Sequence, residues 1–131
     1  EYNEQRLQHF FINRDRFGVV NNLHVIQGRA PEVLNDLPVP NKIFVGGSDG
    51  ELTNLLPYLW SLLPTTGVLV VSAVTDNTRG IIDDFISADL DAKQRENNVE
   101  SVDVAVTRKK MIGGQWDQQK KLPVTLYRFK K

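Results

Sequence analysis

The stretch Val68–Ala73, VLVVSA, is apolar at five of its six positions and constrains the fold more than any other part of the chain. An unbroken apolar run is typical of a strand covered on both faces of a sheet. Helical patterns flank the run, with apolar residues at Leu52, Leu55, Leu56, Leu59 and Leu63 before it and at Ile81, Ile82, Phe85 and Ile86 after it. The sequence therefore predicts an α/β fold with a mostly parallel sheet.

The N-terminal part of the chain predicts a helix and then a strand. Apolar residues recur near helical spacing over residues 2–17, and Gly18 follows where a helix often ends. A short strand is expected at residues 23–27, followed by one or two helical turns at 30–37. A second strand is expected at 42–45.

The segment after that second strand reads FVGGSDGEL. Ser48 and Glu51 have the spacing of a capping box, which predicts the start of the leucine-rich helix. Pro57 lies inside this helix and is expected to kink it or remove one hydrogen bond.

The C-terminal part changes to a period of two residues. Valines alternate with polar or small residues over 101–107, which predicts a half-buried strand. Residues 109–122 are expected to form a long loop, in which Trp116 is a candidate for ligand contact, and 123–129 a final strand. Two successive strands at this end predict one antiparallel strand in the sheet.

Composition excludes several classes of protein. The sixteen basic and sixteen acidic residues balance, which argues against a general binder of polyanions. The chain has no cysteine, which excludes a disulfide scaffold and thiolate zinc sites. The two histidines, His9 and His24, are far apart, and no Walker loop or G-x-S-x-G elbow is present. A hydrolase or a metal site is therefore not indicated.

Charge is nevertheless unevenly distributed along the chain. Between Asp76 and Asp103 there are eight acidic residues and three basic ones, whereas Arg108 to Lys131 holds eight basic residues and the single acid Asp117. The basic segment could be a solvated strand edge, where lysine discourages aggregation, or a lip for an anionic ligand. The apolar runs are too short to span a bilayer and no signal peptide is visible, so we expect a cytoplasmic protein without a membrane partner.

The ends of the expected parallel strands are the best candidates for a binding site. They are residues 28–30, 46–48 and 72–75, and all three should lie at one edge of the sheet. The pair Gly46 and Gly47 bares the backbone there, which would let a ligand approach closely. Such a turn is also compatible with a purely structural role.

Three segments of the chain resemble corrin-pathway methyltransferases: RFGVVNNLHVIQGRAPEVLNDLPVPNKIFVGGSDGEL, TTGVLVVSAVTDNT and MIGGQWDQQKKLPVTLYRF. The family is that of cobalt-precorrin C15-methyltransferase (decarboxylating) and the C-terminal domain of precorrin-6Y C5,15-methyltransferase. Its most specific pieces here are G-x-A-P-x-x-L-x-x-L-P-x-P running into FVGGS, and the late GG followed by PV. The resemblance covers nearly the whole chain. It implies a class I S-adenosylmethionine-dependent methyltransferase fold with a Rossmann-like sheet.

The resemblance also implies roles for individual residues, with S-adenosylmethionine as the cofactor. Glu1 matches the acid that binds the ribose hydroxyls. The other implied cofactor-binding residues are Gly28, Arg29, Ala30, Gly46 and Gly47, and the implied substrate-binding residues are Ser48, Thr75, Arg108, Gly113 and Gly114. No residue is assigned as a catalytic acid or base.

The implied reaction is methylation of carbon C15 of a precorrin tetrapyrrole with decarboxylation, in cobalamin biosynthesis, by a homo-tetramer. Methyl transfer depends mainly on alignment, which agrees with the lack of a catalytic triad. The alternative is a non-catalytic fragment or interaction domain of the same fold that binds no cofactor. A nucleic-acid methyltransferase is less favoured because no surface of interleaved aromatic and basic residues is present, and no nucleic-acid partner is expected.

The start of the chain bears on this alternative. The sequence begins with Glu1 rather than Met, and the glycine-rich cofactor loop of the family would lie upstream of it. Residues 1–131 are therefore expected to be a single methyltransferase-like domain that is truncated at its N-terminus and lacks the first strand of the usual sheet.

Overall fold

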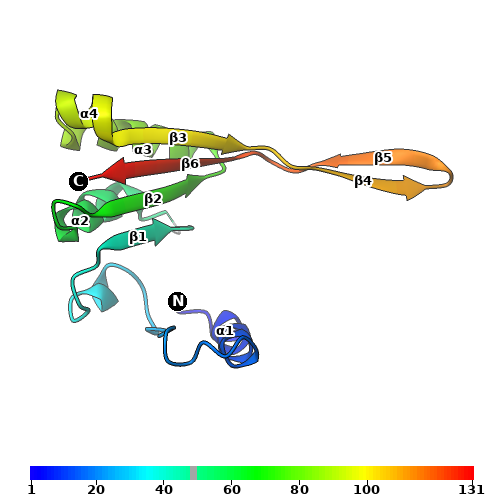
Figure 1. The fold of residues 1–131 in the computed structure, drawn as a ribbon, viewed down its shortest axis with the longest axis horizontal. Coiled ribbons are helices and arrows are strands. Elements are labelled where there is room, and N and C mark those ends of the chain that lie inside the picture. Colours follow the sequence, from blue (N-terminus) through cyan, green and yellow to red (C-terminus); the bar gives the residue numbers. More distant parts are fainter. Residues whose placement is uncertain (48–49) are drawn as a thin grey trace. The chain divides into compact units, whose positions relative to one another are not determined.

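The computed structural model describes residues 1–47 and 50–131. These residues form two compact units, Glu1–Pro38 and Val39–Lys131. Each unit is described by itself, and Figure 1 gives the order of their elements.

The first unit contains the helix α1 (Glu4–Arg16) and a single 3₁₀ turn, η1 (Glu32–Leu34). The side chain of Asn3 caps the start of α1 by accepting a hydrogen bond from the Arg6 N–H at 3.0 Å. At the other end Gly18 has a φ of 66°, a conformation that glycine adopts without strain. The predicted helix and its terminating glycine are therefore confirmed.

The predicted strand at residues 23–27 is wrong, because this segment belongs to no helix or sheet. The Glu1 amino group donates to the Ile26 carbonyl at 3.2 Å, and the Gly28 N–H donates to the Glu1 carbonyl at 3.1 Å. Among the described residues of this unit, the segment and Gly28 thus form sheet-like hydrogen bonds with Glu1 alone. A strand requires a ladder of such bonds, so an apolar pattern without a partner does not make one.

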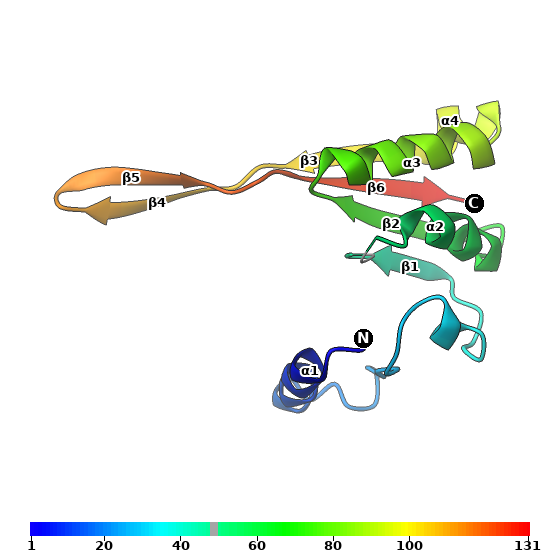
Figure 2. The same cartoon turned by 180° about the vertical axis from the view of Figure 1, so that it is seen from behind.

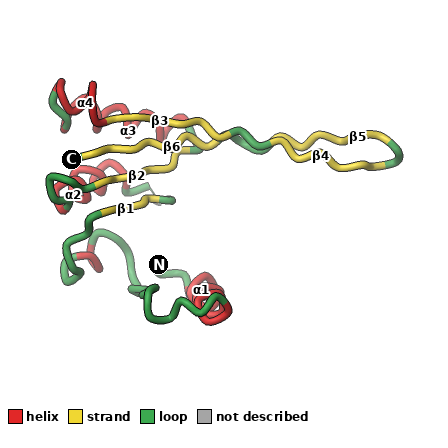
Figure 3. The backbone as a smooth tube through the Cα atoms, in the orientation of Figure 1, coloured by secondary structure: helices red, strands yellow, loops and turns green. Residues whose placement is uncertain are grey.

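The second unit is built on a four-stranded sheet in the order β1-β2-β6-β3 (Figure 3). Its strands are β1 (Lys42–Val45), β2 (Val68–Ala73), β3 (Val99–Val104) and β6 (Val124–Lys130). β1 and β2 are parallel, whereas β6 is antiparallel to both β2 and β3. One strand, β6, runs against the other three, as predicted, but two of the three pairings are antiparallel, so the sheet is mixed rather than mostly parallel.

Three helices accompany the sheet: α2 (Leu52–Leu62), α3 (Asp76–Asp89) and α4 (Ala92–Asn98). Figure 2 shows that α2 and α3 lie on the same face of the sheet. The five leucines predicted for the α2 face are all buried, and Ile82 and Phe85 of α3 are buried as well. Trp60 of α2, Phe85 of α3 and Phe129 of β6 meet edge to face, with ring centroids 5.5–6.4 Å apart. This aromatic cluster joins the helices to the sheet.

The two faces of the sheet differ in burial. Leu69, Val71 and Ala73 point toward the helices and are 0% exposed, whereas the residues between them on β2 are half-buried. Within the described residues of the second unit, helices cover one face and not both. Val102 and Val104 of β3 belong to the open face, and they are 56% and 43% exposed. The strand predicted over residues 101–107 is confirmed only up to Val104, and its valine face is exposed rather than half-buried.

The predicted loop at residues 109–122 is also wrong. Residues there form an antiparallel hairpin of β4 (Thr107–Ile112) and β5 (Gln115–Lys120). Gly113 and Gly114 make its two-residue turn with φ values of 58° and 80°. A glycine pair with positive φ at both positions favours this tight turn, whose twist matches that of the flanking strands.

None of the described helices combines the length and apolar character needed to cross a membrane.

Candidate functional site

A pocket of about 140 Å³ lies at the carboxyl ends of β1 and β2. It is lined by Val45, Gly46, Gly47, Leu52, Val71, Ser72, Val74, Thr75 and Thr78. Ligands of open α/β sheets bind at this edge because the strands end there and the following helices begin. The pocket thus brings together two of the three strand ends predicted from the sequence, 46–48 and 72–75, as far as they are described.

The glycine pair differs in what surrounds each residue. A Cβ at Gly46 would come within 3.1 Å of the Phe44 ring, which fills the space beside it. A Cβ at Gly47 would meet no atom within 4 Å among the described residues, and the φ of Gly47 is not positive. Neither the described packing nor the backbone conformation therefore requires glycine at position 47. A bare backbone on a pocket wall suits the close approach of a ligand.

Three hydroxyl groups supply the polar side of the pocket. The Ser72 hydroxyl donates to the Val45 carbonyl at 3.3 Å and so joins the ends of the two parallel strands. Thr75 caps α3, because its hydroxyl accepts from the Thr78 N–H at 3.2 Å. The Thr75 and Thr78 hydroxyls are 2.8 Å apart. Thr78 was not predicted as a site residue, although the spacing of two threonines at the start of a helix was a usable signal.

The described lining of the pocket is uncharged. Of the described residues that line it, none carries an ionisable side chain. An arrangement of apolar groups, hydroxyls and bare backbone can orient a ligand and exclude water, but it offers no acid or base. Chemistry that depends on proximity and alignment fits this lining better than proton transfer does.

Four predicted cofactor residues lie in the first unit, where Glu1 is tied to its own helix. Its carboxylate accepts from the backbone N–H of Asn3 at 2.9 Å and of Tyr2 at 3.0 Å, and it lies 3.5 Å from Arg6. The Asn3 hydrogen bond, with smaller contributions from Tyr2 and Arg6, lowers the pKa of the Glu1 carboxyl below its usual value. A carboxylate that stays charged is a suitable acceptor for hydroxyl groups.

Gly28, Arg29 and Ala30 form the turn beside Glu1. The Gly28 N–H donates to the Glu1 carbonyl, and the Arg29 guanidinium lies 4.2 Å from the centroid of the Tyr2 ring. Gly28 has a φ of 141°, and a Cβ there would overlap the Val33 side chain. Glycine at position 28 is therefore required by the fold of this unit, whatever else it does.

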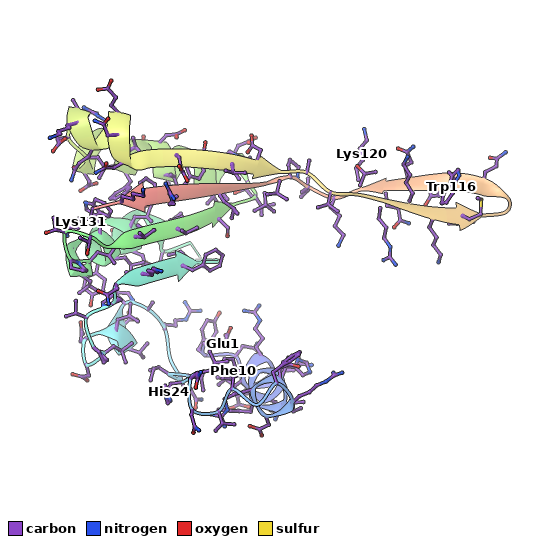
Figure 4. All side chains as sticks on the ribbon, viewed as in Figure 1. Glu1, Phe10, His24, Trp116, Lys120 and Lys131 are labelled. Atoms are coloured by element: carbon purple, nitrogen blue, oxygen red, sulfur yellow. The ribbon has the colours of Figure 1, made fainter. Side chains whose placement is uncertain are left out.

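The predicted substrate residues Arg108, Gly113 and Gly114 lie on the β4–β5 hairpin and do not line the pocket. β2 and β3 are both antiparallel to β6, so they end at the same edge of the sheet, and the hairpin leaves from that edge (Figure 1). Every residue of its two strands is exposed. Figure 4 shows Trp116 and Lys120 standing out from the hairpin, and Trp116 is 66% exposed.

The remaining predictions concern the capping box of Ser48 and Glu51 and the metal-binding potential of the chain. Ser48, and with it the predicted capping box, lies outside the described residues; α2 begins at Leu52 with Glu51 as its N-cap, and the Glu51 side chain makes no capping hydrogen bond. Across residues 1–47 and 50–131, no group of three or more histidine or acidic side chains is arranged to hold a metal ion.

The sequence profile of the precorrin methyltransferase domain family matches residues 1–131 of this chain. The chain belongs to the precorrin methyltransferase family. A precorrin-6Y C(5,15)-methyltransferase [decarboxylating] of Sinorhizobium sp. is 29% identical over 131 residues, which cover 100% of this chain and 29% of that protein. A probable cobalt-precorrin-6B C(15)-methyltransferase (decarboxylating) of Pyrobaculum calidifontis is 33% identical over 75 residues, or 57% of this chain and 38% of the relative. The match thus spans well under half the length of these curated relatives.

Solved structures of the family have the same fold. The precorrin-6y C5,15-methyltransferase of Geobacter metallireducens is 30% identical with a TM-score of 0.82, and the match covers 100% of this chain and 66% of that one. A SAM-dependent O-methyltransferase of Thermotoga maritima is 13% identical with a TM-score of 0.57, covering 91% of this chain and 43% of that one. The second likeness concerns the fold alone. The precorrin methyltransferase sheet described above is therefore of the Rossmann-like methyltransferase type.

Proposed function

We propose that the protein methylates carbon C15 of a precorrin tetrapyrrole with S-adenosylmethionine as methyl donor and removes a carboxyl group in the same overall reaction. Membership of the precorrin methyltransferase family and the names of its relatives support this proposal. The strongest structural support comes from Gly47, which lines the pocket. The packing of the described residues around it does not require a glycine there.

The residues of the pocket fit this cofactor because the bare backbone at Gly47 leaves room for part of it to approach closely. S-adenosylmethionine, when bound, supplies a methyl group on a sulfonium. Ligand sites commonly measure ~300–1,000 Å³, so this pocket would take part of a ligand rather than all of it. We assign it to the reacting end, where Ser72, Thr75 and Thr78 would orient polar groups and the apolar lining would exclude water.

The cofactor roles of Glu1, Gly28, Arg29 and Ala30 remain part of this proposal. Glu1 presents a carboxylate whose lowered pKa keeps it able to accept hydrogen bonds from ribose hydroxyls. Its backbone bond with Gly28 holds the predicted acid and the predicted turn together within the first unit.

The hairpin is our candidate for handling the carboxylates of the tetrapyrrole. Residues 107–121 hold five basic side chains, Arg108, Lys109, Lys110, Lys120 and Lys121, against the single acid Asp117. The hairpin also leaves the sheet at the edge where the pocket lies. A basic surface near a site raises the local concentration of an anionic substrate. Gly113 and Gly114 would serve by forming the turn.

We further infer that the protein assembles as a homo-oligomer, a tetramer by resemblance to the family. An isolated two-stranded hairpin is marginally stable in water. The exposed β4–β5 pair would gain stability from packing against another copy. Light scattering coupled to size-exclusion chromatography gives the mass in solution, and a monomer at micromolar concentration would contradict this inference.

The test of function uses methyl-labelled S-adenosylmethionine with the full-length protein. Cobalt-precorrin-6B is the acceptor, because a relative's name contains it. Label should enter the tetrapyrrole, and the product mass should show one added methyl group and the loss of carbon dioxide. Absence of labelled product, together with no binding of S-adenosylhomocysteine by calorimetry, would refute the proposal and favour a non-catalytic interaction domain.

A further inference from the structure

A buried hydroxyl on the central strand β6 connects three elements of the second unit. Thr125 is 6% exposed and is the buried polar residue of the described core. The register places it between Ala73, the last residue of β2, and Asp103 of β3. Thr125 therefore lies at the sheet edge at which the pocket begins.

Both hydrogen-bonding functions of this hydroxyl are used. Thr125 donates its proton to the Asp103 carboxylate, with an O···O distance of 2.6 Å. It accepts from the Nε of Arg79 at 3.2 Å. Arg79 also donates from Nη1 to the Asp76 carboxylate at 2.8 Å. A chain of hydrogen bonds thus runs from Asp103 on β3 through Thr125 on β6 to Arg79 on α3. Both partners of the Thr125 hydroxyl are charged groups, which strengthens the two hydrogen bonds.

Arg79 belongs to the first part of α3, whose residues form one wall of the pocket. Its backbone N–H donates to the Thr75 carbonyl at 3.1 Å. Thr75 and Thr78, which lie four residues and one residue before it in the chain, both line the pocket. Fixing the Arg79 side chain against β6 consequently fixes the position of these two hydroxyls relative to the strand ends.

We propose that Thr125 is a positioning residue of the candidate site, which it controls through Arg79 without lining the pocket. With Asp103 as its acceptor, it holds the first turn of α3 at the distance from β2 that the reaction needs. This inference rests on the proposed function, since it assigns a purpose to the same site. The bonds are directional, so a side chain of equal shape without the hydroxyl cannot replace them.

The test uses three variants of the full-length protein. Thr125→Val keeps the shape of the side chain and removes both bonds, and Thr125→Ser keeps the hydroxyl. Thr66→Val is the matched control, because Thr66 is exposed in the turn that precedes β2, away from the pocket. If Thr125→Val does not fold, Arg79→Gln breaks the same connection from the helix side, where the side chain is partly exposed.

The first readout is amide hydrogen exchange without ligand. The amides of Thr78 and Arg79 are both bonded to Thr75, so they report on the first turn of α3. We expect Thr125→Val to exchange these amides several times faster while those of α2 are unchanged, and Thr125→Ser to restore them. Equal exchange in Thr125→Val and wild type would overturn the proposal, and this readout holds even if the protein has no methyltransferase activity.

The second readout separates positioning from simple loss of folded protein. Each variant is titrated with S-adenosylhomocysteine to count competent sites, and kcat is divided by that number. Misalignment of reacting groups is costly, so we expect kcat per site to fall about tenfold or more in Thr125→Val, with KM changed much less. Rescue by Thr125→Ser supports the proposal. An unchanged kcat per site in Thr125→Val would overturn it.

Discussion

Gly47→Ala separates the demands of the fold from those of a ligand. The φ of Gly47 is not positive, and an added Cβ would meet no described atom within 4 Å. A Gly→Ala change at a compatible position stabilises a protein by about 0.4–1 kcal/mol, because the unfolded chain loses freedom. The free energy of unfolding should therefore stay the same or rise.

Ligand binding should change in the opposite direction. Gly47 lines a pocket of only about 140 Å³, so a methyl group on its wall removes space that the ligand would fill. We expect the Kd for S-adenosylhomocysteine to rise at least about tenfold, which is about 1.4 kcal/mol of binding free energy. A variant that is as stable as wild type and yet binds poorly would identify Gly47 as a ligand-contact residue.

The assay pairs urea unfolding with calorimetric titration in the full-length protein. Gly80→Ala is the matched control: a Cβ there also meets nothing within 4 Å, and Gly80 lies in α3 without lining the pocket. Gly80→Ala should gain about 1 kcal/mol from helix propensity and bind normally. Wild-type affinity in Gly47→Ala, or a loss of stability greater than about 1 kcal/mol, would refute the reasoning.

Three further predictions test the hairpin, the titration of a tyrosine and the core. Arg108→Gln should raise KM for the tetrapyrrole several-fold with little change in kcat, an effect that shrinks at high salt, and steady-state kinetics at two ionic strengths measure it. Burial, with a smaller contribution from Asp83, raises the pKa of Tyr127. The stability contributed by the neutral Tyr127 side chain is therefore complete below the pKa of about 10 that it has in the unfolded chain, and it is lost as the pH rises through the folded pKa. Urea unfolding above pH 10 should therefore show a steeper loss of stability in wild type than in Tyr127→Phe, and parallel curves would contradict this. Phe129→Ala empties the fully buried centre of the aromatic cluster and should cost about 3–5 kcal/mol of unfolding free energy, whereas Phe44→Ala, 66% exposed, should cost far less.

Much of the second unit could be predicted because several of its helices and strands have clear local sequence patterns. The leucine pattern of α2 and the apolar run of β2 each match one period of secondary structure, and both were placed correctly. The β4–β5 hairpin was missed because polar strands lack an apolar period, although the glycine pair at residues 113 and 114 was the signal for its turn.

Burial and pairing were harder to predict than the elements. The valines of β3 alternate as a half-buried strand would, but which face a helix covers depends on elements far away in the sequence. Likewise, the apolar segment at residues 23–27 could not reveal that it pairs with a single residue.

The candidate site was predictable at its glycines and less so at its hydroxyls. Gly46, Gly47 and Thr75 follow strand ends, and the parallel topology brings such ends together. Thr78 joins them only because α3 begins at Asp76, which places both threonines on the same turn. The separation of Arg108 from the pocket lining could not be foreseen, since it follows from the hairpin's length and direction.

The place of β6 in the sheet has a consequence for biosynthesis. β6 is the last strand of residues 1–131, yet it lies between β2 and β3, which are not paired with each other. While the ribosome is still making the hairpin, β3 has no strand to pair with and β2 has only β1. The sheet can therefore close only after residues up to Lys130 have left the exit tunnel. Nascent chains stalled before Val124 should accordingly be sensitive to proteases, and chains in which Lys130 has left the tunnel should become resistant.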